Sequence, residues 1–466
     1  MKRNFRFYFA LFFAKCTALV LKLIGRRGSS MPGSWAIILC PDFLGRIPRP
    51  KTLVGITGTN GKTTVSNLVA DVLRKNGYDF TNNTFGTNVQ TGVASSLIAN
   101  ATLLGKPKKE LAVFELDERS APRILPYLKP DLLLVTNIFR DSYKRNAHTE
   151  FITDLLCKNI PPETRLLLNA DDLLCAGIHA SPGDRSSAEK QPRVFFGIKQ
   201  LPGEDDHYEN IIRKLDACPN CSAPLEWQFI RYYHIGRARC PNCGWTNPRA
   251  DYQVQSVDPD SMEMQLRSPT GEDRFSLPNA NPINVYNALA AVALLREMGL
   301  TDAQIQKGLS QVELPEDRYT EELVAGKKIV LHLAKGQNPV ACSLTFQNVR
   351  SYPGKKTVLL LHHDHFDEKQ SVENPAWLYD TDFETLNHPD ICQIVVAGGL
   401  QADSYVRMLL AGIPDEKIVH LRDMDAALDR LDLSKDNSLF ILYDMYNTPL
   451  VRKCMASIRE KLAPPH

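Results

Sequence analysis

The 466-residue sequence lacks a net charge large enough to indicate a partner. Its 55 lysines and arginines stand against 53 aspartates and glutamates, which leaves a formal net charge of +2. Proteins that bind nucleic acid usually carry more basic than acidic residues, because the basic residues neutralise the phosphates. The composition therefore gives no support for a nucleic-acid partner. The chain is too long for one hydrophobic core and suggests about three domains.

The sequence also lacks a disulfide framework and a signal cleavage site. Of the 11 cysteines, four form two tight pairs and others lie in apolar runs, among them Cys40, Cys157 and Cys392. This distribution suits a reducing compartment. The apolar stretch at residues 5–13 is interrupted by Lys15, and no small-residue cleavage site follows it. We therefore expect a cytoplasmic protein.

The N-terminal segment, residues 1–48, is expected to form an amphipathic helix followed by a linker. Lys15, Lys22 and Arg26 recur at spacings of seven and four, which places them on one helix face. A membrane span is disfavoured, because two lysines would lie inside a stretch barely long enough. The helix could rest on the inner face of a membrane or pack against the next domain. We favour packing, since a protein interior can bury an apolar helix equally well.

The most informative stretch is residues 55–64, Gly-Ile-Thr-Gly-Thr-Asn-Gly-Lys-Thr-Thr. It joins the end of an apolar strand to a helix expected over residues 63–75, through a glycine-rich turn. Backbone N–H groups of such a turn and the Lys62 ammonium attract an anion, so the stretch predicts a phosphate loop that binds a nucleoside triphosphate. The general phosphate-loop pattern has glycine five residues before Gly61, where this sequence has Ile56. The alternative is a glycine-rich turn that only joins the strand to the helix, but such a turn would not require Lys-Thr-Thr at the start of the helix.

Short apolar runs at residues 111–114, 132–135 and 165–168 predict strands covered on both faces. Their alternation with loops and helices predicts a parallel sheet, at whose carboxyl ends ligands bind. Glu115 follows the first run. Magnesium on ATP needs one or two protein oxygens, and Thr63 and Glu115 could supply them. The alternative for Glu115 is a solvated surface carboxylate.

Four cysteines predict a structural zinc site in a ribbon at about residues 205–255. Cys218 and Cys221 form one C-x2-C pair, and after eighteen residues Cys240 and Cys243 form another. Two such knuckles complete a tetrahedral thiolate site without an open position. Pro-Asn lies inside both pairs, which suggests two equivalent turns; redox-active pairs are the alternative. Other polar and aromatic residues of the ribbon are expected to form a local surface of unknown use: Arg231, Tyr232, Tyr233, Arg237 and Arg239.

The C-terminal part is predicted to form a second α/β unit, because it has apolar runs at residues 329–333, 357–361, 391–396 and 439–442. A histidine-rich loop at residues 362–367 ends the second run. It could hold a metal, but neighbouring side chains of a strand or loop point in different directions. We therefore favour a polar binding loop.

The phosphate loop resembles the G-x-T-G-T-N-G-K-T-T motif of the Mur ligase superfamily. These ATP-dependent ligases form an acyl-phosphate on a carboxylate, which an amine then displaces. The zinc ribbon, Ala334-Lys335…Asn338-Pro339 and Trp377…Asp380-x-Asp382-Phe383-Glu384 narrow the resemblance to the MurT family. The resemblance implies a Mur ligase-like α/β fold: a central parallel-sheet ATPase domain at residues 49–314 with the four-cysteine zinc ribbon inserted, and a Rossmann-like C-terminal domain at residues 315–466.

The MurT family amidates the D-glutamate α-carboxyl of the lipid II stem peptide, using ATP and ammonia from a GatD glutaminase partner. Nothing in this sequence resembles a glutaminase nucleophile elbow. The resemblance implies ATP, Mg²⁺ and Zn²⁺ as cofactors, and Arg318 as a residue that reaches from the domain junction to the nucleotide. It also implies that Asp380, in preference to Asp382, completes the partner's Cys-His pair. The implied catalytic residues are Lys62, Glu115, Arg318 and Asp380, with magnesium at Thr63 and Glu115, and ATP at Gly58, Thr59, Asn60, Gly61, Lys62, Thr63, Thr64, Asn284 and Asn287.

Departures from the family pattern cluster in the elements that face substrate and partner. They are residues 363–368, the inserted Gly336 and Gln337, residues 444–448 and residues 144–148. The substrate assignment therefore has less support than the ATP assignment. Two alternatives stay open: a stand-alone ligase that joins an amino acid to a carboxylate, and a non-catalytic scaffold subunit that keeps nucleotide as a structural ligand.

Overall fold

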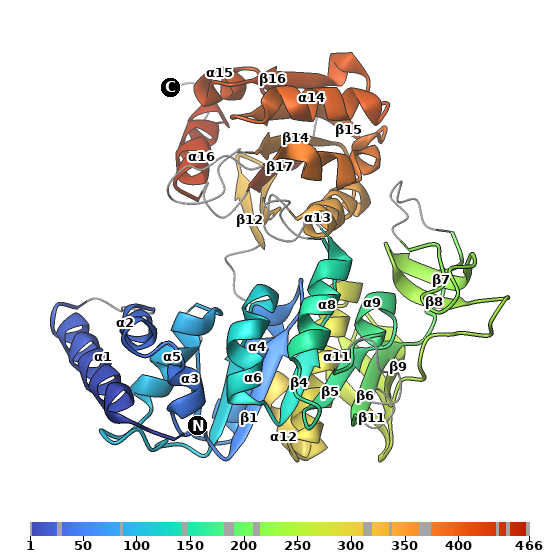
Figure 1. Ribbon diagram of the computed structural model, residues 1–466. Coiled ribbons are helices and arrows are strands. Elements are labelled where there is room, and N and C mark those ends of the chain that lie inside the picture. Colours follow the sequence, from blue (N-terminus) through green and yellow to red (C-terminus); the bar gives the residue numbers. More distant parts are fainter. Residues whose placement is uncertain are drawn as a thin grey trace. The chain divides into compact units, whose positions relative to one another are not determined.

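The computed structural model describes residues 2–25, 30–83, 87–140, 148–180, 191–207, 215–310, 319–334, 338–362, 374–434, 438–443 and 448–462 (Figure 1). The chain forms two compact units. The first comprises Met1–Ile138, His148–Glu209 and Arg213–Glu313, and the second comprises Phe139–Ala147, Asn210–Ile212 and Leu314–His466.

The first unit is built on a nine-stranded sheet with the order β11-β10-β9-β6-β5-β4-β1-β3-β2. The strands from β2 to β9 in this order run parallel, and β10 and β11 add antiparallel hairpins at one edge. The three predicted apolar runs are confirmed as β3, β4 and β5. The strands are β1 (Thr52–Thr57), β2 (Phe80–Asn82), β3 (Leu111–Glu115), β4 (Leu132–Val135), β5 (Arg165–Asn169), β6 (Arg193–Ile198), β9 (Tyr252–Asp258), β10 (Glu263–Ser268) and β11 (Gly271–Ser276).

Helices cover both faces of this sheet, as its doubly buried strands require. On one side α4 (Lys62–Lys75), α11 (Pro282–Glu297) and α12 (Asp302–Leu309) pack together. The expected helix after the phosphate loop is confirmed, and Gly77 follows it with a left-handed φ of 75°. The opposite core is filled by α1 (Phe5–Leu23), α2 (Met31–Leu39), α3 (Phe43–Arg46), α5 (Gln90–Ala99), α6 (Ala121–Leu128), α8 (Thr149–Asn159) and α9 (Leu173–Ala176). The short helix η1 (Glu118–Ser120) contacts α6 and α8.

The N-terminal helix packs one face into the first unit. Phe7, Leu11 and Ala14 are fully buried in the core shared with α2 and α5. Lys15 Nζ donates hydrogen bonds to the carbonyls of Ile98 at 2.9 Å and Ala101 at 2.8 Å, so this cation faces protein. Packing is therefore confirmed for this face. Within the described parts of the chain, no helix combines the length and apolarity that crossing a bilayer would need.

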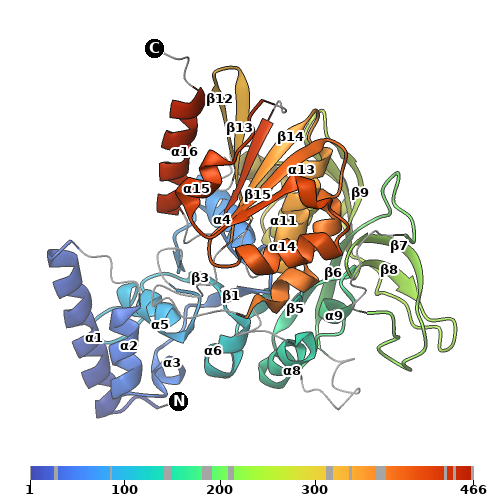
Figure 2. The same ribbon diagram turned by 90° about the horizontal axis from the view of Figure 1, so that it is seen from above.

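The second unit is a six-stranded sheet with the order β12-β13-β17-β14-β15-β16, parallel except for the β12–β13 pair. Helices α13 (Pro339–Ser351) and α14 (Gln401–Leu410) bury one face, and α15 (Met424–Asp429) and α16 (Thr448–Leu462) bury the other (Figure 2). The four predicted runs are confirmed as β13, β14, β15 and β17. The other elements are β12 (Tyr319–Val324), β13 (Lys327–Leu333), β14 (Lys356–Leu361), η3 (Pro375–Asp380), η4 (Phe383–Leu386), β15 (Ile391–Ala397), η5 (Asp415–Lys417), β16 (Ile418–Leu421) and β17 (Ser438–Tyr443).

Candidate functional site

The phosphate loop lies where β1 ends and α4 begins, at the carboxyl edge of the parallel sheet. Its backbone is fixed by Asn137, which follows β4: the Asn60 N–H donates to Asn137 Oδ1 at 2.9 Å, and Asn137 Nδ2 donates to the Asn60 carbonyl at 3.0 Å. Thr136 Oγ1 adds a bond to the same carbonyl at 2.7 Å. Helix α4 starts without a side-chain cap, so the N–H groups of its first turn need partners from outside the helix. The loop therefore fits a bound phosphate.

Two glycines make this geometry possible. Gly58 and Gly61 have φ values of 121° and 84°, a region that residues with a Cβ rarely adopt. A Cβ on Gly58 would lie 2.2 Å from Thr136 Oγ1, and one on Gly61 would lie 2.2 Å from Asn287 Oδ1. A side chain at position 58 would meet the backbone of Thr136 and Asn137, whereas one at position 61 would have to displace the side chain of Asn287.

Lys62 is held at the mouth of the loop by three oxygens. Its ammonium donates to the carbonyls of Gly58 and Thr59, the latter at 3.3 Å, and lies 3.2 Å from Glu118 Oε2. Glu118 is buried in η1, directly after β3. The prediction from the sequence missed Glu118, although it stands only three residues beyond Glu115. The rule that ligand-facing groups follow parallel strands could have found it.

Thr63 and Glu115 lie together, as the magnesium hypothesis requires. Thr63 Oγ1 donates to Glu115 Oε1 at 3.2 Å, and Asn88 Nδ2 donates to the same oxygen at 3.1 Å. The backbone of Glu115 is held by Asn83, whose side chain bonds both its N–H and its carbonyl. Both asparagines lie between β2 and α5, and α5 begins at Gln90, after the extended residue Val89.

The three asparagines at the start of α11, Asn281, Asn284 and Asn287, have different roles. Asn281 caps the helix, accepting from the N–H groups of Ile283 and Asn284. Asn287 is buried and places its Oδ1 against Gly61. Asn284 is half-buried one helical turn earlier. Asn281 therefore caps the helix, and Asn287 does not cap it but contacts the phosphate loop.

The four predicted zinc ligands meet in one cluster. The Sγ atoms of Cys218, Cys221, Cys240 and Cys243 all lie within 4.8 Å of one another, and the pairs 218–243 and 221–240 are 3.6 and 3.4 Å apart. Four thiolates around zinc at about 2.3 Å require sulfur–sulfur distances of roughly 3.8 Å, so the cluster fits the ion. All four are free thiols.

The two knuckles are equivalent turns, as the repeated Pro-Asn predicts. The N–H groups of Ser222 and Gly244 bond the carbonyls of Cys218 and Cys240, and both residues have positive φ. The asparagines cross over: Asn220 Nδ2 donates to Cys243 Sγ, and Asn242 Nδ2 donates to Cys221 Sγ. The hydrogen bond from Asn242 lowers the pKa of Cys221 to about 6, while burial raises the pKa of Cys240 to about 11.

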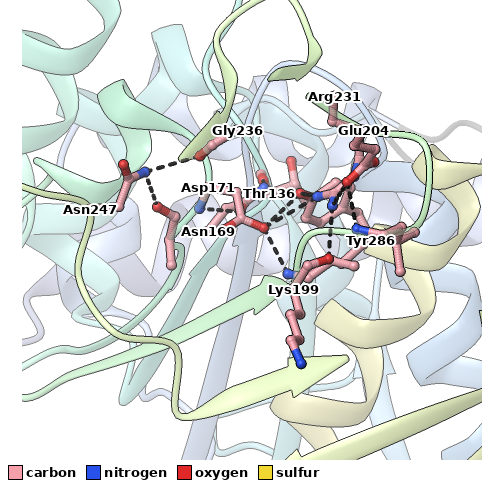
Figure 3. Close-up of polar contacts among 12 residues, drawn as sticks. Thr136, Asn169, Asp171, Lys199, Glu204, Arg231, Gly236, Asn247 and Tyr286 are labelled. Carbon is pink, nitrogen blue, oxygen red and sulfur yellow. Dashed lines mark hydrogen bonds and ion pairs between the residues drawn. The ribbon is translucent and has the colours of Figure 1, made fainter. Parts of the chain in front are cut away.

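The ribbon hairpin, β7 (Glu226–Tyr232) and β8 (Ile235–Arg239), is anchored to the sheet by a buried polar network (Figure 3). Arg231 donates to Glu204 at 2.6 and 2.8 Å, to Tyr286 Oη, and lies 3.6 Å from Asp171 Oδ2. Tyr286 in turn donates to Asp171 at 2.7 Å. Burial raises the pKa of Asp171. Because Tyr286 precedes Asn287 on α11, the ribbon and the phosphate loop are supported by neighbouring residues of one helix.

This anchoring corrects the expectation of a ribbon surface. Arg231, Tyr232 and Tyr233 are each less than a tenth exposed, and only Arg239 of the five residues is fully exposed, with Arg237 intermediate. The residue that follows β5, Ala170, also helps to hold the ribbon against the sheet. Asn247 Nδ2 donates to the Ala170 carbonyl at 2.7 Å and to the Gly236 carbonyl at 3.2 Å. Arg231 and Asn247 therefore have structural roles, because their side chains form hydrogen bonds inside the first unit.

In the second unit, Asp380 ends η3 and is buried. Its Oδ2 forms an ion pair at 2.7 Å with Arg140, which belongs to the same unit. Asp382 is also buried, and its N–H donates to Ser343 Oγ at 2.9 Å. His362 packs edge-on against Trp377 at 5.3 Å between ring centroids. Arg318, residues 335–337 and residues 363–368 lie outside the described residues.

Comparison with known proteins identifies relatives over both units. Residues 56–214 match the model of the Mur ligase middle domain, and residues 335–446 match that of the MurT ligase C-terminal domain. A Staphylococcus aureus protein named lipid II isoglutaminyl synthase (glutamine-hydrolyzing) subunit MurT is 29% identical over 87% of this chain and 88% of its own length. The equally named Streptococcus pneumoniae protein is 28% identical over 94% of both chains. A pseudomurein peptide ligase type C from Methanothermus fervidus shares the fold, with a TM-score of 0.62, 19% identity, and coverage of 90% of this chain and 81% of that one.

Proposed function

The chain is a divergent member of the MurT family within the Mur ligase superfamily, and from that premise we propose that it is the ATP-consuming subunit of a lipid II amidotransferase. The proposed reaction converts the D-glutamate α-carboxyl of the stem peptide into an amide. The observation that carries it is the joint arrangement of Lys62, Thr63, Glu115 and Asn287 around one phosphate loop in a chain that also matches the MurT C-terminal domain.

The chemistry needs an activated carboxylate. A carboxylate does not react with ammonia until one of its oxygens becomes a leaving group, so a carboxylate oxygen first attacks the γ-phosphorus of ATP and ADP departs. Ammonia then attacks the carbonyl carbon of the acyl-phosphate, and inorganic phosphate leaves with the oxygen. The transition state of phosphoryl transfer is loose and is stabilised chiefly by positioning and positive charge.

The residues of the first unit supply that positioning. We propose that the amides at the start of α4 and the Lys62 ammonium hold the phosphates, with Asn284 and Asn287 beside the nucleotide. Thr63 Oγ1 and Glu115 Oε1, 3.2 Å apart, would hold Mg²⁺, which supplies charge neutralisation. Glu118 would orient Lys62, since its carboxylate lies 3.2 Å from the ammonium. Arg318 is proposed as a further cation at the nucleotide, and Zn²⁺ as a structural ion in the cysteine cluster.

The ammonia is proposed to come from a GatD-like glutaminase that forms a heterodimer with this chain. The relatives are named as glutamine-hydrolyzing, and this sequence carries no motif resembling a glutaminase nucleophile elbow. Hydrolysis of glutamine by water gives glutamate and ammonia. Asp380 is proposed to complete the partner's Cys-His pair, because a carboxylate that orients an imidazole can activate a thiol nucleophile. ATP and reduced cysteines support a cytoplasmic site of action, at the inner face of the membrane that carries the lipid substrate.

The experiment is amidation of a lipid II analogue by this chain and a glutaminase partner with ATP, Mg²⁺ and glutamine, followed by mass spectrometry. We expect one carboxyl-to-amide conversion per ATP hydrolysed, and none when Lys62→Ala replaces the native chain. Absence of product while ATP still binds would rule the function out. ATP consumption by the chain alone with an amino-acid acceptor would favour a stand-alone ligase, and full cellular function of Lys62→Ala would favour a scaffold.

A further inference from the structure

Helix α1 presents a continuous apolar stripe to solvent on the side opposite its packed face. Phe5, Phe12 and Leu23 are 84%, 65% and 77% exposed. Members of the stripe recur every three or four residues, so they lie along one helix face. A surface helix of a globular protein normally places polar residues there. The exposed stripe consists of Phe5, Tyr8, Phe9, Phe12, Phe13, Cys16, Leu19, Val20, Leu23 and Ile24.

Helix α2 extends this apolar surface. Its Met31, Trp35 and Ile38 are 49%, 41% and 64% exposed, at spacings of four and three. The Trp35 ring meets the Phe13 ring edge-on, with 5.4 Å between centroids, so the two stripes touch. The two helices lie side by side in both ribbon views. We call the exposed stripes of α1 and α2 together the N-terminal apolar face.

A loop near the start of α1 adds to this face. Leu103 and Leu104 are 78% and 64% exposed. Arg3 donates to the Leu104 carbonyl at 3.5 Å, which places the loop beside the helix. Lys106 and Lys108 follow in the same loop and are at least partly exposed. Apolar side chains next to lysines are therefore repeated on a second segment of the chain.

The charges carried by the segment that forms α1 and α2 have one sign. The first 41 residues contain seven lysines and arginines and no aspartate or glutamate. Exposed Lys2, Arg3, Arg6 and Lys22 flank the stripe, while Lys15 turns inward to protein carbonyls. An apolar helix face with aromatic residues and a basic border is the pattern that binds anionic lipid surfaces.

We propose that the N-terminal apolar face docks this chain onto an anionic lipid bilayer, with α1 and α2 lying in the plane of the surface. A second copy is disfavoured as the occupant, because a two-fold pair would bring the same unbalanced cations against each other. A bilayer with anionic headgroups instead meets both features, since the acyl region accepts the aromatic and aliphatic side chains while the headgroups pair with the cations. The inference goes beyond the amidation proposed above and does not depend on it.

The test is sedimentation of the full-length chain with vesicles of phosphatidylglycerol and phosphatidylcholine, without ATP or lipid II. We expect binding to the anionic vesicles that falls at high salt. The double variant Phe12→Asp/Leu23→Asp should lower the partition coefficient by about tenfold or more per position. The control Leu323→Asp/Leu410→Asp adds the same charges at side chains that are 70% and 68% exposed elsewhere, and should bind as the native chain does.

Two further readouts keep the result interpretable. Circular dichroism checks that each variant stays folded, and Phe12→Ser/Leu23→Ser repeats the loss of binding without new charge. Lipids brominated on the acyl chain should quench Trp35 fluorescence, and Trp35→Phe should remove that quenching. The proposal is overturned if the native chain does not bind anionic vesicles, if the stripe variant binds as well as the native chain, or if the control loses as much binding. It is also overturned if the native chain is a dimer that the stripe variant makes monomeric without a change in vesicle binding.

Discussion

Asn287 and Gly61 meet so closely that a Cβ on the glycine would lie 2.2 Å from the asparagine Oδ1. The contact joins the start of α4 to the first turns of α11, two helices 220 residues apart in the sequence as counted between their first residues, Lys62 and Pro282. A side chain at position 61 would project into the space that the side-chain amide of Asn287 occupies, so the contact favours glycine there.

Gly61→Ala should weaken ATP binding by about tenfold or more, since the new methyl group must displace Asn287 or the loop itself. Gly203→Ala is a matched control: Gly203 has a φ of 86°, close to the 84° of Gly61, but no atom lies within 4 Å of its added Cβ. Both variants should lose about 1–2 kcal/mol of unfolding free energy from left-handed backbone strain. Calorimetric titration with ATP and chemical denaturation measure the two effects. Equal ATP affinities for both variants would contradict the role of the Asn287 contact.

Glu118→Gln should lower the turnover number for amidation by about tenfold, with little change in the KM for the lipid substrate, because the carboxylate that orients the Lys62 ammonium is lost. Glu118→Ala should be worse and also less stable, since it leaves a largely buried cation without its ion pair. Glu163→Gln is the control: Glu163 pairs with Lys129 at 2.9 Å, but both side chains are more than half exposed. Steady-state kinetics separate the cases, and unchanged turnover in Glu118→Gln would refute a positioning role.

Thr63→Val should raise the Mg²⁺ concentration needed for half-maximal ATP-dependent activity by about tenfold, because a ligand oxygen is removed without loss of volume. Thr63→Ser retains the hydroxyl and should stay within about twofold of the native chain. Glu115→Gln should resemble Thr63→Val, since both change the same pair of oxygens. A magnesium titration at saturating ATP gives the comparison. If Thr63→Ser and Thr63→Val required the same magnesium concentration, the hydroxyl would not be a ligand.

Cys221→Ser should reduce bound zinc from about one ion per chain to well below that and lower the melting temperature by several degrees, because metal binding contributes directly to the folding of such a site. Cys392→Ser, at a partly exposed thiol of β15 far along the sequence from the cluster, should change neither value. Elemental analysis and thermal unfolding measure the two properties. Full zinc occupancy in Cys221→Ser would exclude a four-thiolate site.

Asp380→Asn should abolish most amidation driven by glutamine, by about a hundredfold or more, while amidation driven by added ammonium salt stays near the native rate. The reason is that added ammonia bypasses the glutaminase, whereas the proposed phosphorylation of the carboxylate does not use Asp380. Asp415→Asn, at a carboxylate bonded to Tyr405 of α14 in the second unit, serves as the control. Equal loss of both activities in Asp380→Asn would place its effect in folding or in the ligase step.

The candidate site was predictable wherever a local motif carries the chemistry. The phosphate loop, its glycines and Lys62 are contiguous, and the four cysteines are fixed by their spacing, so neither needed long-range information. Glu118, Asn83 and Asn88 were not identified, because their role depends on where η1 and the loop after β2 meet Glu115. The ribbon residues Arg231, Tyr232 and Tyr233 were assigned to a surface, since burial depends on the partners that a distant segment supplies.

The sequence by itself determined the parallel strands, the phosphate-binding turn and the cysteine cluster, because each follows from hydrophobic period, backbone freedom at glycine or ligand spacing over short distances. Tertiary structure alone decided which of the three asparagines at the start of α11 caps the helix and which one reaches Gly61. It also decided that one face of α1 is buried while the other stays exposed. Both outcomes depend on helix rotation against neighbours far away in the chain, and a period of 3.6 residues defines faces without saying what will cover them.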